Sequence, residues 1–344
     1  MTTLRRLTPL LLALAAGAGL LGAKGGPPAT MQAAAIDHAG GAEVLTVRTL
    51  PVPKPDANEV LIAVHTAGVA SWDVGVREHP EQLKNARFPL VLGTDGAGVV
   101  AALGADVHGL KVGDQVYAYS WDNPKGGFYA EYVAVPAERV GAVPHGLTLT
   151  QAGAIGTTAL TALQGIDDAL HLKSGETILI HGAAGGVGTL AVQFAKLRGA
   201  RVLASVSAAE EFEFVKSLGA DAVVDGRHGD VSAAVQAFAP GGLDAVLALA
   251  GGEALEKATA ALREGGRVAF PSGVRPEPKP RAGITVVRYD AIPGPAEYAR
   301  LNTAIEAARL RVPIAAQFPL AEAAQAQERV AGGHLQGKVI LEVR

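Results

Sequence analysis

The stretch that decides the fold is HGAAGGVGTL, residues 181–190, which consists almost entirely of small residues. A short apolar run, Thr177–Ile180, precedes it and has the length of a buried strand. The residues that follow, Leu190–Leu197, place apolar side chains at helical spacing and end before Gly199. A glycine-rich loop between a strand and a helix is the setting in which this pattern predicts a phosphate-binding turn.

Three glycines of the loop have separate expected roles. Gly185 permits a tight turn, Gly186 leaves room for the backbone to approach a pyrophosphate, and Gly188 lets the helix pack on its strand. The helix N-terminus adds unpaired N–H groups and a partial positive charge. Ala183 stands where the pattern usually has its first glycine. The loop therefore predicts a dinucleotide-binding site.

Downstream of the loop, strands and helices alternate at intervals of about 25 residues, which is typical of βαβ units and a parallel sheet. The fold class expected is α/β, with a Rossmann-type doubly wound parallel sheet. The expected strands are Arg201–Ser205, Ala222–Val224, Ala245–Leu249 and Arg267–Phe270, and the helices between them are Glu210–Leu218, Val231–Phe238 and Glu253–Leu262.

The segment before the loop has a different rhythm. From Met31 to about Val143, short β-branched runs alternate with glycine and proline turns, as in PLVLGTDGAGVVAALG (Pro89–Gly104). This spacing favours a compact β-barrel-like domain over helices. After a proline-rich loop, the chain is expected to form an edge strand at Ile284–Val287, helices at Glu297–Leu310 and Ala321–Ala331, and a last strand at Val339–Val343.

Composition narrows the classes of function. The 344 residues are 49% hydrophobic and 18% charged, with a net charge of −3. This is the composition of a folded globular protein, and the absence of a Lys/Arg cluster argues against a nucleic-acid partner. No cysteine is present, which excludes disulfides, thiolate metal sites and cysteine nucleophiles.

Residues 1–30 have the layout of an export signal. Arg5-Arg6 precede an apolar run, Leu7–Gly22, and Ala16-Gly17-Ala18 is one possible cleavage site. The paired arginines suggest the twin-arginine route and a periplasmic protein, with no stable membrane span in the mature chain. The alternative is that Met31 is the true start and the protein is cytoplasmic.

The end of the second strand bears on which dinucleotide binds. An NAD site usually has an acidic residue there for the ribose hydroxyls, whereas this chain has Ser205-Val206-Ser207-Ala208. A 2′-phosphate is then not repelled, and Arg227 is the nearest cationic candidate together with His228. NADP(H) is therefore favoured, with NAD(H) possible, although both serines could simply cap the strand end.

Eight segments occur in an order and spacing that resemble a known family. They are AGVASWD (67–73), PLVLGTDGAGVV (89–100), VGDQVYAY (112–119), GGFYAEYVAVPA (126–137), HGAAGGVG (181–188), LGADAVVD (218–225), GGRVAFPSG (265–273) and GKVILEV (337–343). Residues 31–344 resemble a zinc-independent medium-chain dehydrogenase/reductase of the quinone oxidoreductase (ζ-crystallin-like) type.

The resemblance implies how the chain divides. Residues 1–30 form the signal-like or upstream extension, and 31–151 a GroES-like β-barrel catalytic domain. Residues 152–288 form the Rossmann NADP-binding domain, and 289–344 return to the catalytic domain. A cofactor would lie in the cleft between them, and Ile284–Val287 would pair two chains as a homodimer.

The resemblance also assigns cofactor-binding residues, with Thr157 near the nicotinamide and Ser207 at the adenosine-phosphate side. The remaining expected contacts are Ala184, Gly185, Gly186, Val187, Gly188, Ser205, Arg227, Ala250, Gly251, Ser272 and Gly273. Two departures from the family pattern stand out: Ala70 replaces a common asparagine near the nicotinamide, and Gly226 replaces an aromatic residue or histidine near the ribose phosphate.

Zinc is not expected. Zinc-using relatives have a ligand cysteine in the first segment and Gly-His-Glu in the second, where this chain has Ser71 and Gly93-Thr94-Asp95. The nine histidines are scattered, without a close pair beside a carboxylate. No metal ligand is therefore assigned.

Hydride transfer from a reduced nicotinamide needs no protein nucleophile, and no residue is assigned as catalytic. The function implied is reduction of a small electrophile, a quinone or an α,β-unsaturated carbonyl. Trp72, Tyr119 and Trp121 are candidate walls of the substrate pocket or ordinary packing residues, and Tyr119 is a candidate proton donor. Asp73 and Arg77 are expected to form an internal ion pair.

Two alternatives remain open. An enoyl-thioester reductase is one, although relatives with that activity have a tyrosine shortly after the first segment and Val74–Glu78 contains none. A non-catalytic NADP(H)-binding sensor or structural protein is the other, because the fold alone does not determine function.

Overall fold

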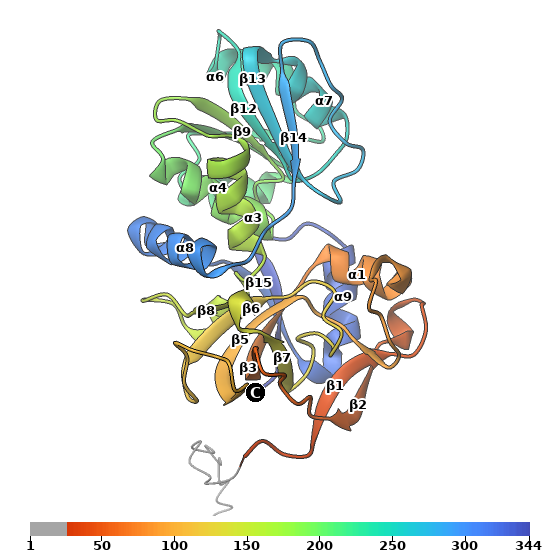
Figure 1. The fold of residues 1–344 in the computed structure, drawn as a ribbon. Coiled ribbons are helices and arrows are strands. Elements are labelled where there is room, and N and C mark those ends of the chain that lie inside the picture. The colour runs from red at the N-terminus through yellow and green to blue at the C-terminus, as the bar shows by residue number, and fades with distance from the viewer. Residues whose placement is uncertain (1–25) are drawn as a thin grey trace, which may run out of the picture.

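The structure is a computed structural model that describes residues 26–344. Figure 1 shows two parts of the chain one above the other, with a parallel sheet in the upper part and mainly antiparallel sheets in the lower, where only β15 (Ile314–Pro319) and β16 (Lys338–Glu342) among the described strands pair in parallel. Most of the expected export signal, residues 1–25, lies outside the described residues. In residues 26–344, no helix is both long and apolar enough to cross a membrane.

The upper part is a six-stranded parallel sheet in the order β11-β10-β9-β12-β13-β14. This confirms the expected doubly wound α/β sheet. The order reverses between β9 and β12, which creates a crevice at the carboxyl ends of the strands. The strands are β9 (Thr177–His181), β10 (Arg201–Val206), β11 (Ala222–Asp225), β12 (Leu243–Ala248), β13 (Leu262–Pro271) and β14 (Thr285–Tyr289).

Helices cover both faces of this sheet because its buried strands present apolar side chains on both sides. Ile178 and Ile180 face a core shared with α3 and α4, while Leu179 faces a second core under α6 and α7. The helices of this part are α3 (Thr158–Gln164), α4 (Gly186–Leu197), α5 (Phe212–Ser217), α6 (Val231–Phe238) and α7 (Glu253–Ala260).

The lower part contains a seven-stranded sheet in which a strand near the C-terminus pairs with a strand from the first quarter of the chain. Strand β16 (Lys338–Glu342) lies antiparallel to β3 (Glu59–Val69), and β15 (Ile314–Pro319) extends the sheet. The remaining strands are β5 (Asp95–Leu103), β6 (Gln115–Tyr119), β7 (Tyr132–Pro136) and β8 (Val140–Ala142), and a smaller sheet holds β1 (Thr30–Ile36), β2 (Thr46–Pro51) and β4 (Leu90–Val91).

The stretch Pro89–Gly104 forms two strands separated by a turn, as expected, and these strands, β4 and β5, belong to different sheets. Strand β1 begins at Thr30, one residue before the expected start of the domain. The other helices of the lower part are α1 (Ser71–Glu78), α2 (Leu149–Gly153), α8 (Pro295–Ala308) and α9 (Ala323–Ala331).

Specific contacts join the two parts. The amide of Gly337, just before β16, donates to the carbonyl of Ala184 in the glycine loop at 2.9 Å. The side-chain amide of Gln193 on α4 donates to the Arg311 carbonyl at 2.9 Å and accepts from the Arg311 amide at 2.8 Å, and Arg311 lies between α8 and β15 of the lower part. The glycine loop is thereby fixed against the lower part of the molecule.

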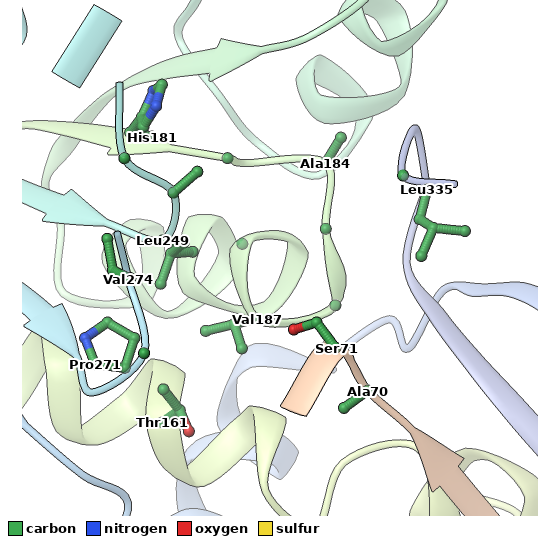
Figure 2. A pocket seen from close by; sticks show the side chains of 18 of the residues that line it. Ala70, Ser71, Thr161, His181, Ala184, Val187, Leu249, Pro271, Val274 and Leu335 are labelled. Carbon is green, nitrogen blue, oxygen red and sulfur yellow. The ribbon is translucent and has the colours of Figure 1, made fainter. Parts of the chain in front are cut away.

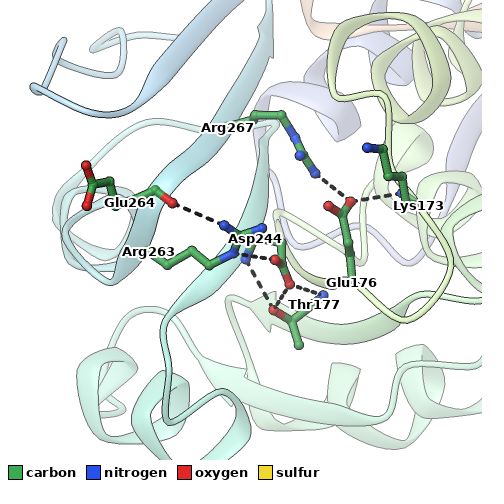
Figure 3. A network of polar contacts seen from close by, with 7 residues as sticks. All are labelled: Lys173, Glu176, Thr177, Asp244, Arg263, Glu264 and Arg267. Atoms are coloured by element: carbon green, nitrogen blue, oxygen red, sulfur yellow. Dashed lines mark hydrogen bonds and ion pairs between the residues drawn. The ribbon is translucent and has the colours of Figure 1, made fainter.

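A polar network closes the opposite end of the parallel sheet (Figure 3). Asp244 at the start of β12 accepts hydrogen bonds from the Thr177 amide and hydroxyl, both at 2.7 Å, and from Arg263 at 2.6 Å. Arg267 pairs with Glu176 at 2.5 Å. These residues lie at the amino ends of the strands, away from the crevice, and align β9 with β12 and β13.

Candidate functional site

One cavity of about 1530 Å³ lies at the carboxyl ends of the parallel strands, between the two parts of the chain. Figure 2 shows Ala184 of the glycine loop above Ser71 and Ala70 of the lower part, and Val187 of α4 beside Ser71. Leu249, from the loop after β12, lies on the far wall. The volume exceeds the range of roughly 300–1,000 Å³ usual for small-ligand pockets, so the cavity has room for a dinucleotide and a second small molecule.

The structure brings every sequence-predicted site residue to this one cavity. The residues are far apart in the chain but come from adjacent strand ends and from the facing lower part, and their individual roles stay predictions. They are Trp72, Tyr119, Trp121, Thr157, Ala184, Gly185, Gly186, Val187, Gly188, Ser205, Ser207, Arg227, Ala250, Gly251, Ser272 and Gly273.

The glycine loop is held to its neighbouring strand by its own backbone. The amides of Gly182 and Ala183 both donate to the carbonyl of Ser205, at 3.1 and 3.0 Å. Helix α4 then begins at Gly186, and its first amides have no partner within the helix. A side chain added at Gly186 would meet no protein atom closer than 3.4 Å, so the space over the helix N-terminus is open to a ligand.

A carboxylate lies at the end of the cavity beside β10. Residues 205–208 contain no acidic residue, but Glu211, three positions further along the chain, folds back over the strand end. Its carboxylate accepts a hydrogen bond from the Ser207 amide at 2.8 Å and contacts the Ser207 hydroxyl at 3.2 Å. Glu211 is only 3% exposed. The available signal in the sequence was an acidic residue four positions after Ser207.

The Ser205 hydroxyl also forms a hydrogen bond within the protein, to the ring of His181. Ser205 is 1% exposed, and its hydroxyl lies 3.1 Å from Nδ1 of His181. Burial lowers the pKa of His181, which keeps the ring neutral and able to share one proton with the serine. Arg227, by contrast, is exposed at the cavity wall, and none of the ion pairs found in residues 26–344 involves its guanidinium.

The expected Asp73–Arg77 ion pair is wrong. Asp73 instead accepts hydrogen bonds from the Ala70 amide at 2.8 Å and from the Tyr129 hydroxyl at 3.0 Å. Arg77 donates to the Gln327 side chain at 2.6 Å. The carboxylate is in the first turn of α1, where it caps the helix N-terminus, while Arg77 leaves the last turn toward α9.

A buried polar cluster that the sequence analysis did not assign lies beside the cavity. It contains Asp95 of β5, which is 0% exposed, and Lys338 of β16, which lines the cavity and is 5% exposed. Burial raises the pKa of Asp73 to about 7, with Lys338 opposing and Asp95 adding to the increase. A lysine directly before the apolar run Val339–Leu341 of the closing motif was the available signal.

The positions expected to replace zinc ligands face this cluster. Thr94 Oγ1 accepts a hydrogen bond from Nε1 of Trp72 at 2.8 Å, and the Thr157 amide donates to Asp95 at 2.8 Å. Within residues 26–344, no group of three His, Asp or Glu side chains is placed to hold a metal ion. Zinc independence itself stays a prediction.

Tyr119 and Trp121 extend from the main cavity to a second, smaller one of about 530 Å³. Burial, together with the nearby Asp95 and Asp290, raises the pKa of Tyr119 well above its usual value. Its hydroxyl therefore keeps its proton at neutral pH. This is compatible with a hydrogen-bond donor at the pocket wall.

Comparison with known proteins finds two matching family models and relatives that cover most of the chain. Residues 186–288 match the family model of zinc-binding dehydrogenases, and residues 56–145 match that of the alcohol dehydrogenase GroES-like domain. The chain is 32% identical over 326 residues to a quinone oxidoreductase from Sus scrofa, a match that covers 90% of this chain and 97% of that protein.

Solved structures agree with this result. The quinone oxidoreductase from Coxiella burnetii is 30% identical with a TM-score of 0.81, over 92% of this chain and 100% of that one. A mycobacterial protein solved in complex with NADPH is 29% identical with a TM-score of 0.80, over 91% of this chain and 100% of its own.

Proposed function

Since this chain belongs to the quinone oxidoreductase (ζ-crystallin-like) type of medium-chain dehydrogenase/reductase, we propose that it reduces a quinone or an α,β-unsaturated carbonyl with NADPH, without zinc. The observation that carries the proposal is the single cavity at the strand-order reversal, which gathers the glycine loop and the aromatic residues. The bound nicotinamide would supply the hydride, and the protein would supply orientation and a water-poor pocket.

Different residues along the cavity would bind different parts of the cofactor and the acceptor. The open N-terminus of α4 and the Gly185–Gly186 backbone would hold the pyrophosphate. Thr157 and Val187 would lie at the nicotinamide end. Trp72 and Tyr119 would flank a flat acceptor, because aromatic rings supply large apolar contact area to such molecules.

The proposal is tested by stopped-flow oxidation of NADPH and NADH, with a quinone and an enone as separate acceptors. Oxidation of either reduced nucleotide by either acceptor supports the reductase function. Tight nucleotide binding without oxidation by both acceptors would contradict it and favour a nucleotide-binding sensor.

The preference between the two nucleotides depends on two side chains of opposite charge. Arg227→Ala is expected to lower the ratio of kcat/KM for NADPH to that for NADH about tenfold, because a charge-assisted hydrogen bond to the 2′-phosphate is lost. Glu211→Gln is expected to raise the same ratio, because a carboxylate beside Ser207 repels the phosphate and the amide does not. Steady-state kinetics with both nucleotides measure the two ratios.

Glu211 is also the specific observation that favours NADH as the alternative cofactor, since its carboxylate can accept hydrogen bonds from ribose hydroxyls. An unchanged ratio in both variants would place the adenosine ribose elsewhere in the cavity.

We further propose a homodimer formed through β14. This strand is at the edge of the parallel sheet, and an unpaired edge is a template for pairing with a second chain. Light scattering of the purified protein measures the mass, and a monomeric mass would refute the proposal.

A further inference from the structure

Three buried polar atoms without a hydrogen-bond partner lie beside the cavity, at the end where the proposed function places the nicotinamide. They are Asp95 Oδ1, Thr157 Oγ1 and Lys338 Nζ, and they account for three of the five such side-chain atoms found in residues 26–344. Buried polar groups are nearly always paired, because leaving one unpaired costs about 1–3 kcal/mol. Their concentration at one place indicates a position prepared for an absent ligand atom.

The ammonium of Lys338 is the only cation among the three. Its side chain leaves the start of β16 and passes Gly186, where its Cδ is 3.4 Å from the position that a Cβ would take. Nζ then lies 4.0 Å from Asp95 Oδ1 and 5.0 Å from the centre of the Trp72 ring. A separation of 4.0 Å is too long for a hydrogen bond, so the ammonium has donors to spare.

The surrounding charges favour one kind of ligand oxygen as the hydrogen-bond partner of the Lys338 ammonium. Two buried carboxylates, Asp95 and Asp73, lie near the ammonium and would repel a multiply charged phosphate more strongly than an oxygen that carries a single negative charge. A neutral carbonyl oxygen is not repelled in this way. It becomes negative only as the acceptor is reduced, and the ammonium would then offset that charge.

We propose that Lys338 Nζ donates a hydrogen bond to the carbonyl oxygen of the acceptor, with Asp95 and Thr157 holding the ammonium and that oxygen in place. The inference rests on the proposed function. A C–H bond of the reduced nicotinamide would break, and its hydrogen would leave with both electrons as a hydride that forms a new C–H bond at the acceptor carbon. The nicotinamide would be oxidised and the acceptor reduced. The electron pair of the acceptor π system moves onto the oxygen, and a proton from solvent later completes the product.

The ammonium would therefore donate a hydrogen bond to the developing oxyanion in a water-poor pocket. Removing one such donor typically lowers the rate by about 10²–10³-fold. Lys338→Met keeps the length and most of the apolar contact of the side chain but removes the charge. Lys216→Met, at an exposed lysine on α5 remote from the cavity, is the matched control.

The experiment measures three quantities on the purified full chain and both variants. These are kcat/KM for a quinone at saturating NADPH, the Kd of NADPH from fluorescence, and the binding of 4-nitrophenol in the presence of NADP⁺ from its absorbance. Lys338→Met is expected to lower kcat/KM about 10²–10³-fold. The Kd of NADPH should change by less than about threefold, and binding of the nitrophenolate anion should be lost.

Other outcomes overturn the proposal in distinguishable ways. A tenfold weaker NADPH affinity with normal kcat would assign Lys338 to the nucleotide, and no change in any quantity would make it structural. If Lys338→Met does not fold, nitrophenol binding to the wild-type protein still tests the proposal. The wild-type protein should bind nitrophenol as the anion at a pH below the solution pKa of nitrophenol. Binding of the neutral form would contradict the role of the ammonium. If the wild type oxidises no reduced nucleotide but binds the anion, the proposed function fails and the anion site stands.

Discussion

Gly188→Ala is expected to cause the largest loss of stability of any single change in the glycine loop. A Cβ at this position would lie 2.2 Å from the carbonyl oxygen of Gly182 and 2.7 Å from the Cα of Ala183. Both are backbone atoms at the carboxyl end of β9, so a rotamer change cannot relieve the overlap. Overpacking typically costs about 1–3 kcal/mol, and more where backbone has to move.

The free energy of unfolding from urea denaturation measures this loss, and nucleotide binding is expected to fall with it because the loop moves away from the N-terminus of α4. Gly186→Ala is the matched control in the same turn. Its Cβ would meet side-chain atoms of Lys338 and Thr158 at 3.4 and 3.5 Å and the Gly337 carbonyl oxygen at 3.8 Å, and all three are ordinary van der Waals contacts.

This control is expected to keep the stability of the wild type but weaken nucleotide binding at least tenfold, since the new methyl group occupies the ligand's space. Equal stability of the two variants would show that helix–strand packing at Gly188 is looser than its backbone contacts indicate.

Asp73→Asn is expected to make the protein more stable above pH 7. Burial raises the pKa of Asp73 to about 7, whereas an unfolded aspartate has a pKa of about 3.9. As the pH rises through this window, the unfolded chain releases the proton first. The free energy of unfolding therefore falls between about pH 4 and 7 and is constant above it.

One pKa unit corresponds to about 1.4 kcal/mol, so keeping ionised Asp73 buried costs on the order of 4 kcal/mol. Asparagine has no charge to bury, and its Oδ1 can still accept from the Ala70 amide and the Tyr129 hydroxyl. Thermal unfolding at pH 5 and pH 8 measures the effect. The variant should gain stability relative to the wild type at pH 8 and lose most of that gain at pH 5. A gain that is independent of pH would show that Asp73 does not titrate in this window.

The sequence alone predicted the parallel sheet, and the residues that it predicted to bind a cofactor line one cavity at the carboxyl ends of the strands. Residues 181–190 combine a strand end, a glycine turn and a helix start, and these local preferences suffice because the three parts are adjacent in the chain. The regular alternation after the loop predicted the remaining strands for the same reason, and the edge position of 284–287 agrees with β14.

The sequence could not place side chains that depend on the packing of distant segments. Glu211 reaches Ser207 only because the turn after β10 folds back, and Asp73 bonds to Tyr129 rather than to Arg77, four residues away on the same helix.

Lys338 and Asp95 are 243 positions apart and meet because β16 and β5 both pair with β3. Burial and electrostatics at such a meeting are properties of the assembled core, where removal from water changes the energy of each charge. The sequence therefore determined the framework and the glycine loop, and the tertiary structure alone decided which charged groups lie buried beside the cavity.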